Sequence, residues 1–126
     1  MSLDFYLTVP PDPNEQPHKC FHCGQTVPPG DHHVYSSNIT HNLTEMARAA
    51  GIHKALWRPE EIPATHARDI VQLLDDGLRL LVAEPDRFRR FNSPNGWGRY
   101  DDFVEFVRGV LDACRTWPNA TIRVSR

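Results

Sequence analysis

Two stretches that alternate between apolar and polar residues, one near each end of the chain, limit most strongly what this sequence can fold into. Residues 3–9 alternate until Pro10 and Pro11 end the pattern, and residues 120–125 alternate again through Ile122 and Val124. A period of two is typical of a strand with one buried face. We expect the first and last strands to pair in one small sheet.

Between these strands, most of the chain has the apolar period of a helix. The pattern predicts helices over 38–50, 65–83 and 101–115, with a short one after Pro85. Residues 34–37 resemble a short strand, and 57–63 an irregular link. The sequence therefore predicts an α+β domain, in which an antiparallel-containing sheet of N- and C-terminal strands is covered by about three to four helices. At 126 residues, we expect one domain over 1–126.

Charge and hydropathy exclude several classes of protein. The formal net charge is −2 and the pI about 6.4, which argues against a general nucleic-acid binder and a polybasic membrane-surface protein. No apolar run approaches the length of a membrane span, and the first residues lack the pattern of a secretory signal. We therefore expect the three cysteines to be reduced rather than paired in disulfides.

The motif Cys20-Phe21-His22-Cys23-Gly24 lies in a stretch rich in proline, histidine and glycine, over 10–34, which we interpret as a zinc-knuckle-like loop insertion. Two thiolates at this spacing can bind one Zn²⁺ from a tight turn, and a closed structural site needs two further ligands. His32 and His33 are the candidates we favour, and His18 and Asp31 are further ones. Three alternatives stay open: a structural zinc that holds the loop, a metal-free pair of thiols, and a catalytic zinc.

The segment Asn38–Glu45 has an unusual polar face for a predicted helix. A solvated helix face usually carries good helix formers, whereas Asn38, His41 and Asn42 are poor ones. Such conflicts between local preference and fold are frequent at functional sites. The alternative is that these residues only cap the helix.

Two further segments combine aromatic rings with groups that recognise ligands. In Asn95–Tyr100, glycines flank Trp97 and allow the backbone to approach a ligand closely. Trp57 precedes Arg58, and an arginine beside an aromatic ring suits phosphate pairing or stacking on a base. In each case the tryptophan could equally belong to the core. The predicted ligand-binding residues are Asn38, His41, Asn42, Trp57, Arg58, Trp97, Arg99 and Tyr100.

Several long segments of the sequence resemble those of a family of small phage, prophage and bacterial proteins of uncharacterised activity. The resemblance covers most of the chain outside 10–34, and supplies no activity, substrate or cofactor. It implies a phage-linked context, in which small proteins often counter host defences, and hence the cytoplasm of a bacterial host. The segments lie in Met1–Thr8, Tyr35–Leu43, Ala50–Ile52, Leu56–Ile62, Phe91–Tyr100 and Val124–Arg126.

Three functions are compatible with these residues. The first is a non-catalytic binding protein that sequesters a nucleotide-like small molecule. The second is a protein-interaction module, in which a structural Zn²⁺ held by Cys20, Cys23, His32 and His33 shapes a loop that contacts a host protein. The third is a small hydrolase with His41 as general base and Glu45 orienting it. We favour binding over catalysis, because no nucleophile motif accompanies the histidine.

Overall fold

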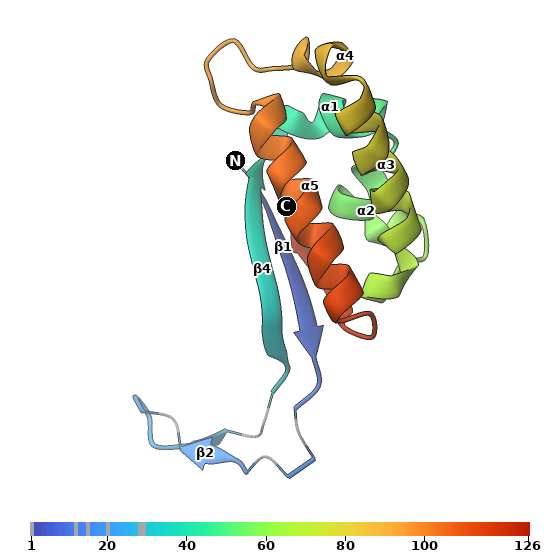
Figure 1. The fold of residues 1–126 in the computed structure, drawn as a ribbon. Helices are drawn as coiled ribbons and strands as arrows, with labels where there is room; N and C mark the ends of the chain where they lie inside the picture. Colours follow the sequence, from blue (N-terminus) through green and yellow to red (C-terminus); the bar gives the residue numbers. More distant parts are fainter. Residues whose placement is uncertain (1, 12, 15, 20, 28–29) are drawn as a thin grey trace.

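A computed structural model describes residues 2–11, 13–14, 16–19, 21–27 and 30–126. Its centre is a three-stranded antiparallel sheet in the order β4–β1–β5. The strands are β1 (Ser2–Val9), β4 (His32–Thr40) and β5 (Thr121–Ser125). The α+β class and the pairing of the first and last strands are confirmed. Figure 1 shows β4 and β1 side by side, with the helices packed against them.

The apolar face of β1 explains its central position. Leu3, Phe5 and Leu7 are fully buried, whereas the residues between them face the other side of the sheet and are partly exposed. Their partners in β4 and β5 include Ile39 and Ile122, which are also buried. The alternation seen in the sequence thus produces one apolar sheet face, which must be covered.

The helices that cover this face are α1 (Thr44–Ala49), α2 (His53–Trp57), α3 (Val71–Ala83), α4 (Pro85–Arg89) and α5 (Tyr100–Thr116). Short 3-10 turns, η1 (His41–Leu43), η2 (Pro59–Glu61) and η3 (Ala67–Asp69), join them. The longest helix, α5, buries Phe103, Val107 and Val110. Among the helices of the described chain, none is long and apolar enough to cross a membrane.

The helix predicted to begin at Asn38 begins later, which corrects the sequence interpretation. Strand β4 continues to Thr40, which pairs with Ser2, and the α-helix starts only at Thr44. The backbone ladder with β1 overrides the weak helical preference of these residues. Asn38 and Asn42 are therefore not one helical turn apart: Asn38 belongs to a strand and Asn42 to η1.

The helix predicted over 65–83 begins only at Val71. Residues 65–67 run beside β5, because Ile122 N–H donates to the Thr65 carbonyl at 2.9 Å and Ala67 N–H donates to the Ala120 carbonyl at 2.9 Å. The side chains of His66 and Asp69 form a capping box at the start of η3 rather than of α3. The link predicted over 57–63 contains the last residue of α2 and the whole of η2. The sequence pattern did not indicate either element.

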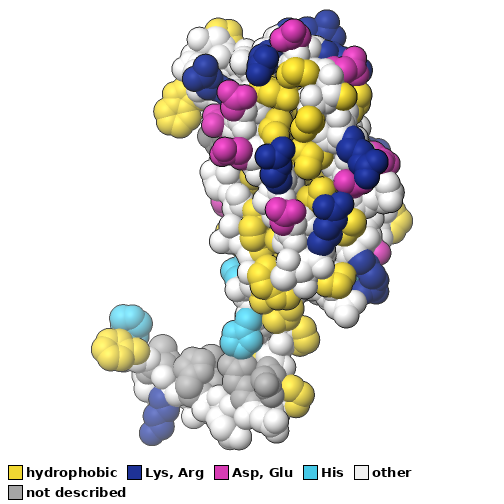
Figure 2. All heavy atoms as spheres, viewed as in Figure 1, with side chains coloured by type: hydrophobic (Ala, Val, Ile, Leu, Met, Phe, Trp, Pro, Cys, Tyr) yellow, Lys and Arg dark blue, Asp and Glu magenta, His cyan; other side chains and the backbone are white. Residues whose placement is uncertain are grey.

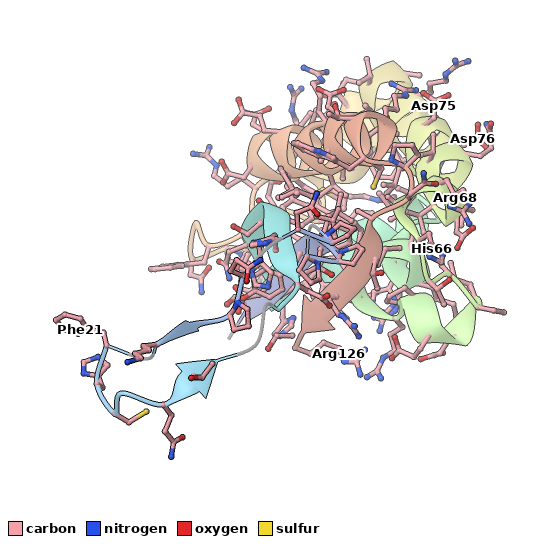
Figure 3. All side chains as sticks on the ribbon, turned by 90° about the horizontal axis from the view of Figure 1, so that it is seen from below. Phe21, His66, Arg68, Asp75, Asp76 and Arg126 are labelled. Carbon is pink, nitrogen blue, oxygen red and sulfur yellow. The ribbon has the colours of Figure 1, made fainter. Side chains whose placement is uncertain are left out.

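Strands β1 and β4 extend beyond the helices into an excursion. Their last pair is Val9 with His32, and between these residues β2 (His18–Lys19) pairs with β3 (Thr26–Val27). The excursion projects from the end of the sheet (Figure 1), and Phe21 at its far end is 97% exposed (Figure 3).

Candidate functional site

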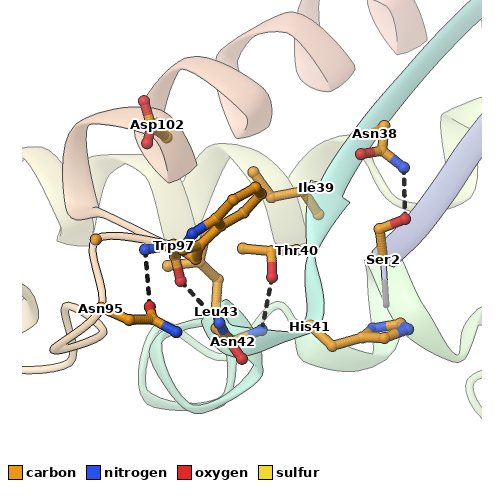
Figure 4. A pocket seen from close by; sticks show the side chains of 12 residues that line it. Ser2, Asn38, Ile39, Thr40, His41, Asn42, Leu43, Asn95, Trp97 and Asp102 are labelled. Carbon is orange, nitrogen blue, oxygen red and sulfur yellow. Dashed lines mark hydrogen bonds between the residues drawn. The ribbon is translucent and has the colours of Figure 1, made fainter.

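An open groove of about 1120 Å³ lies where β4 ends beside the loop that precedes α5 (Figure 4). Successive side chains of a strand point to opposite faces, so a hollow lined by the consecutive residues 38–43 runs past the end and edge of β4 rather than over one face. The lining residues are Ser2, Asn38, Ile39, Thr40, His41, Asn42, Leu43, Asn95, Gly96, Trp97, Gly98 and Asp102.

The backbone of the loop is fixed to β4 and η1, whereas the ring of Trp97 is 71% exposed. Asn42 Nδ2 donates to the Trp97 carbonyl at 2.9 Å, and Trp97 N–H donates to Asn95 Oδ1 at 2.9 Å. Gly98 has a φ of +110°, and a Cβ there would lie 3.1 Å from the Cβ of Asn42. Only glycine combines this conformation with so close an approach.

His41 is held by a tryptophan behind it. Trp57 is 3% exposed, and its Nε1–H donates to His41 Nδ1 at 2.8 Å. Because an indole can only donate, Nδ1 is the acceptor and the neutral imidazole carries its proton on Nε2. His41 therefore presents a donor rather than a free lone pair, which disfavours a role as general base. Glu45, expected to orient His41, instead pairs with Arg48 at 2.6 Å.

A second histidine, His53, packs on the indole ring of Trp57. The rings of His53 and Trp57 are stacked, with centroids 5.5 Å apart and planes 10° from parallel. Burial lowers the pKa of His53, and the charges of Arg48 and Arg58 lower it further. Arg126 (labelled in Figure 3) donates to the Trp57 carbonyl at 2.7 Å and pairs with Glu60 at 2.6 Å. Trp57 is thus a buried support for the groove rather than part of its surface.

The structure brings together half of the predicted ligand-binding residues. Asn38, His41, Asn42 and Trp97 line the groove, with Trp57 behind it. The remaining three do not line it: Arg58 pairs with Glu61 at 3.5 Å, Arg99 precedes α5, and Tyr100 is buried with its hydroxyl donating to the Leu81 carbonyl at 2.7 Å. No arginine or lysine is among the lining residues, all of which the structure describes.

Sequence reasoning missed several residues of the groove, notably Ser2 and Asp102. Ser2 could have been found only by predicting that β1 pairs with β4. Across that pair, Asn38 Nδ2 donates to Ser2 Oγ at 2.9 Å and to Asp4 Oδ1 at 2.6 Å. Asp102 lies in the first turn of α5, where the helix dipole stabilises an acidic side chain. An acid is expected at this position in any helix, so nothing in the sequence marked Asp102 as a groove residue.

The predicted zinc site falls partly outside the described residues, since Cys20 is not among them. Cys23 is an exposed thiol, and the His33 ring stacks on Tyr6 with centroids 4.8 Å apart. His32 forms the last pair of β4 with Val9. Within the part of the chain that the structure describes, no three His, Cys, Asp or Glu side chains are close enough together to hold a metal. Zinc binding stays a prediction.

Comparisons with protein-family models, with curated proteins and with solved structures gave no match for this chain.

Proposed function

We propose that this protein is a non-catalytic binding protein whose groove between β4 and the Trp97 loop holds a nucleoside-like small molecule. One observation carries the proposal: an exposed indole ring stands on a fixed loop in a groove that is also lined by amide, hydroxyl and imidazole groups. A flat ligand that is polar at its edges matches this combination.

The recognition chemistry follows from the groups that line the groove. Stacking of a base on an aromatic side chain contributes about 1–3 kcal/mol. The Nε2–H of His41 is oriented by Trp57 and can donate to a ring nitrogen or carbonyl of the ligand. The NH₂ group of Asn38 donates to Ser2 and Asp4, and that of Asn42 donates one bond to the Trp97 carbonyl, so these side chains offer a ligand their carbonyl oxygens and the second N–H of Asn42.

The charge of the groove selects among nucleotide-like ligands. Its only charged lining residue is Asp102, and Arg58, which was expected to meet a phosphate, is paired with Glu61 elsewhere. A phosphate here would lack a cation and lie near a carboxylate. We therefore expect neutral nucleosides to bind more tightly than their phosphorylated forms.

The phage-linked context is carried by the same segments. Tyr35–Leu43 and Phe91–Tyr100, two of the segments that resemble the phage and bacterial family, contain most of the groove. Sequestering a nucleoside-containing molecule from a host defence is the form that this binding takes in our proposal. Sequestration requires no covalent bond to be broken. This agrees with a His41 whose Nδ1 accepts from Trp57 and whose Nε2–H can donate to a ligand.

The test is calorimetric titration of the full-length protein with the common nucleosides and with their 5′-monophosphates. We expect at least one nucleoside to bind and its monophosphate to bind more weakly. Trp97→Ala should abolish binding, whereas Trp117→Ala should not, because Trp117 is also exposed, at 37%, but lies at the opposite end of α5.

Either of two results would contradict the proposal. The first is that no nucleoside binds, and the second is that binding survives Trp97→Ala. His41→Gln provides a finer test, because glutamine keeps a donor but loses the orientation imposed by Trp57. It should weaken binding less than His41→Ala does.

A second candidate, a zinc-clipped docking loop for a host protein, is favoured by the exposure of Phe21 at the far end of the excursion. A single exposed ring is common on protein surfaces, and what favours contact here is that Phe21 lies within the Cys20–Cys23 motif. Metal analysis of the purified protein tests the clip. The proposal requires about one zinc per chain, lost in Cys20→Ser, and fails if the unmodified protein holds none.

A further inference from the structure

The two outer strands of the sheet, β5 and β4, differ in whether their outer edges are covered. The outer edge of β5 is covered, because Thr65–Ala67 pairs with it and His66 forms a bridge to Thr121. Strand β4 is the last strand at the other edge, and no described strand pairs with its outer side. Figure 1 shows β4 at the margin of the molecule, with α5 beside it.

The exposed edge carries little of the usual protection against pairing, apart from a register shift at Val34, which has no partner in the ladder with β1. Proteins commonly place lysine, proline, inward-pointing charges or very short strands at such edges. The segment His33–Ser37 contains no lysine, arginine, acid or proline, and it belongs to the longest strand of the described sheet. Among the described residues, the outer edge of β4 is therefore unpaired and can accept another strand.

Acidic side chains of α5 flank this edge. Gly109 marks where the helix meets β4, because a Cβ on it would lie 2.8 Å from the hydroxyl of Tyr35. Asp102, Glu105 and Asp112 are exposed and lie seven, four and three residues from Gly109, which places them on the same helix face. Figure 2 shows acidic side chains over this helix with basic side chains among them.

The electrostatics of Tyr35 agree with this placement. Burial raises the pKa of Tyr35, and the carboxylate of Asp112 adds to the effect. Arg108, the basic residue among positions 102–112, lies three residues from Glu105 and four from Asp112 and offsets part of their charge, which leaves three acids against one base on this side of the helix. A strand that pairs with His33–Ser37 would therefore lie beside a row of carboxylates.

We propose that the outer edge of β4 over His33–Ser37 takes an extended, basic segment of a partner protein as a fourth strand. Main-chain hydrogen bonds would supply affinity, and lysine or arginine side chains facing Asp102, Glu105 and Asp112 would supply selectivity. A second copy of this chain fits less well, because two-fold pairing of β4 with itself would bring two acidic α5 faces to the same side of one sheet. This interaction shares Asp102 with the groove and does not depend on a ligand being bound there.

The test uses a displayed library of random ten-residue peptides selected on the full-length protein. We expect the selected peptides to be basic and to bind in solution by fluorescence anisotropy. N-methylation of alternate amides in one register should abolish binding, and the same modification shifted by one residue should not, because a strand pairs through alternate amides. Amide exchange should slow within residues 33–37 when the peptide is bound.

Charge-reversal variants separate this site from general attraction. Glu105→Lys with Asp112→Lys should weaken binding about tenfold or more. The matched control, Asp76→Lys with Asp86→Lys, changes the net charge equally at exposed positions on α3 and α4 and should bind as the unmodified protein does. Trp97→Ala should also leave peptide binding unchanged, which distinguishes failure here from failure of the groove.

Four results would overturn the proposal: recovery of no binding peptide, selection of acidic or uncharged peptides, indifference of binding to N-methylation, or equal effects of the two double variants. Sedimentation that shows a dimer broken by Ser36→Lys would assign the edge to a second copy instead. Thermal unfolding of every variant checks that it remains folded.

Discussion

At the scale of single residues, the two described cysteines differ sharply in their surroundings. Cys114 is fully buried on the inner side of α5, and burial raises the pKa of its thiol to about 12. Cys23 lies exposed in the excursion. Because the thiolate is the reactive form, position alone sets a large difference in reactivity.

We predict that iodoacetamide at pH 8 modifies Cys23 in the folded protein and leaves Cys114 unmodified until denaturant is added. Peptide mapping by mass spectrometry measures both sites in one sample. Rapid labelling of Cys114 without denaturant, at the rate of Cys23, would show that the interior around α5 opens far more readily than the structure indicates.

His41 shows which parts of the site the sequence could supply. The residue types of Asn38–Asn42 and of Asn95–Tyr100 are unusual enough to mark both segments from the amino-acid pattern alone. The bond from Trp57 to His41 joins residues 16 apart whose relative position depends on the packing of η1 and α2. For that reason the sequence, which left His41 open as a base, did not indicate that its Nδ1 accepts from Trp57.

At the scale of elements, Gly77 determines how closely α3 can pack. It is buried in the middle of the helix, and a Cβ there would lie 2.3 Å from Cγ2 of Ile52. Glycine is the poorest helix former apart from proline, so its presence is explained by this contact rather than by helix propensity.

We predict that Gly77→Ala destabilises the protein by about 1–3 kcal/mol, the usual cost of overpacking, although alanine favours helix. Urea unfolding followed by circular dichroism measures this. Asp76→Ala, at the exposed neighbouring position, is the control and should change the free energy of unfolding far less. If Gly77→Ala proved as stable as the unmodified protein, the close packing of α3 on Ile52 would be wrong.

The turn before α3 gives a pH dependence with a definite sign. Backbone N–H groups of His66 and Thr65 donate to the Asp69 carboxylate, which lowers the pKa of Asp69 below 3.8. The ionised form is the one stabilised by folding, so its contribution is present above pH 3.8 and is lost as the pH falls through the lowered pKa.

We therefore predict that Asp69→Asn lowers the melting temperature at pH 7, and that its difference from the unmodified protein shrinks as the pH falls toward 3. Asp86→Asn, at a highly exposed position, should show little difference at either pH. A deficit for Asp69→Asn that stayed constant over this range would mean that the charge of Asp69 is not what caps η3.

The boundary between β4 and α1 shows why the sequence predicts elements better than their limits. An apolar stripe through Leu43, Met46 and Ala47 correctly indicates a helix, and all three residues are buried. The start of that helix depends on how far β4 follows β1, which a partner distant in the sequence decides. The same competition with a distant strand moved the start of the helix predicted after Thr65.

At the scale of the whole molecule, the sheet and helices depend little on the excursion. Val9 and His32 are already paired, and β2 and β3 pair only with each other. The buried core is assembled from β1, β4, β5 and the helices, without a described residue from between Val9 and His32.

We predict that replacing residues 10–31 with Asn-Gly, a sequence that favours a two-residue hairpin turn, leaves a folded protein with a similar melting temperature. Circular dichroism and nucleoside titration would both be unchanged, because the groove lies at the other end of β4. Loss of folding in this variant would mean that the excursion helps to hold the core together.

Fixation of the Trp97 loop has a consequence for how binding proceeds in time. Asn42 and Asn95 hold the backbone on both sides of the indole, and Gly98 packs directly against η1. A ligand would meet a loop already in its bound position, so little conformational entropy is lost on association. We expect the association rate to follow ligand concentration linearly, without the plateau of a slow loop closure, so that differences in affinity among ligands arise in their dissociation rates.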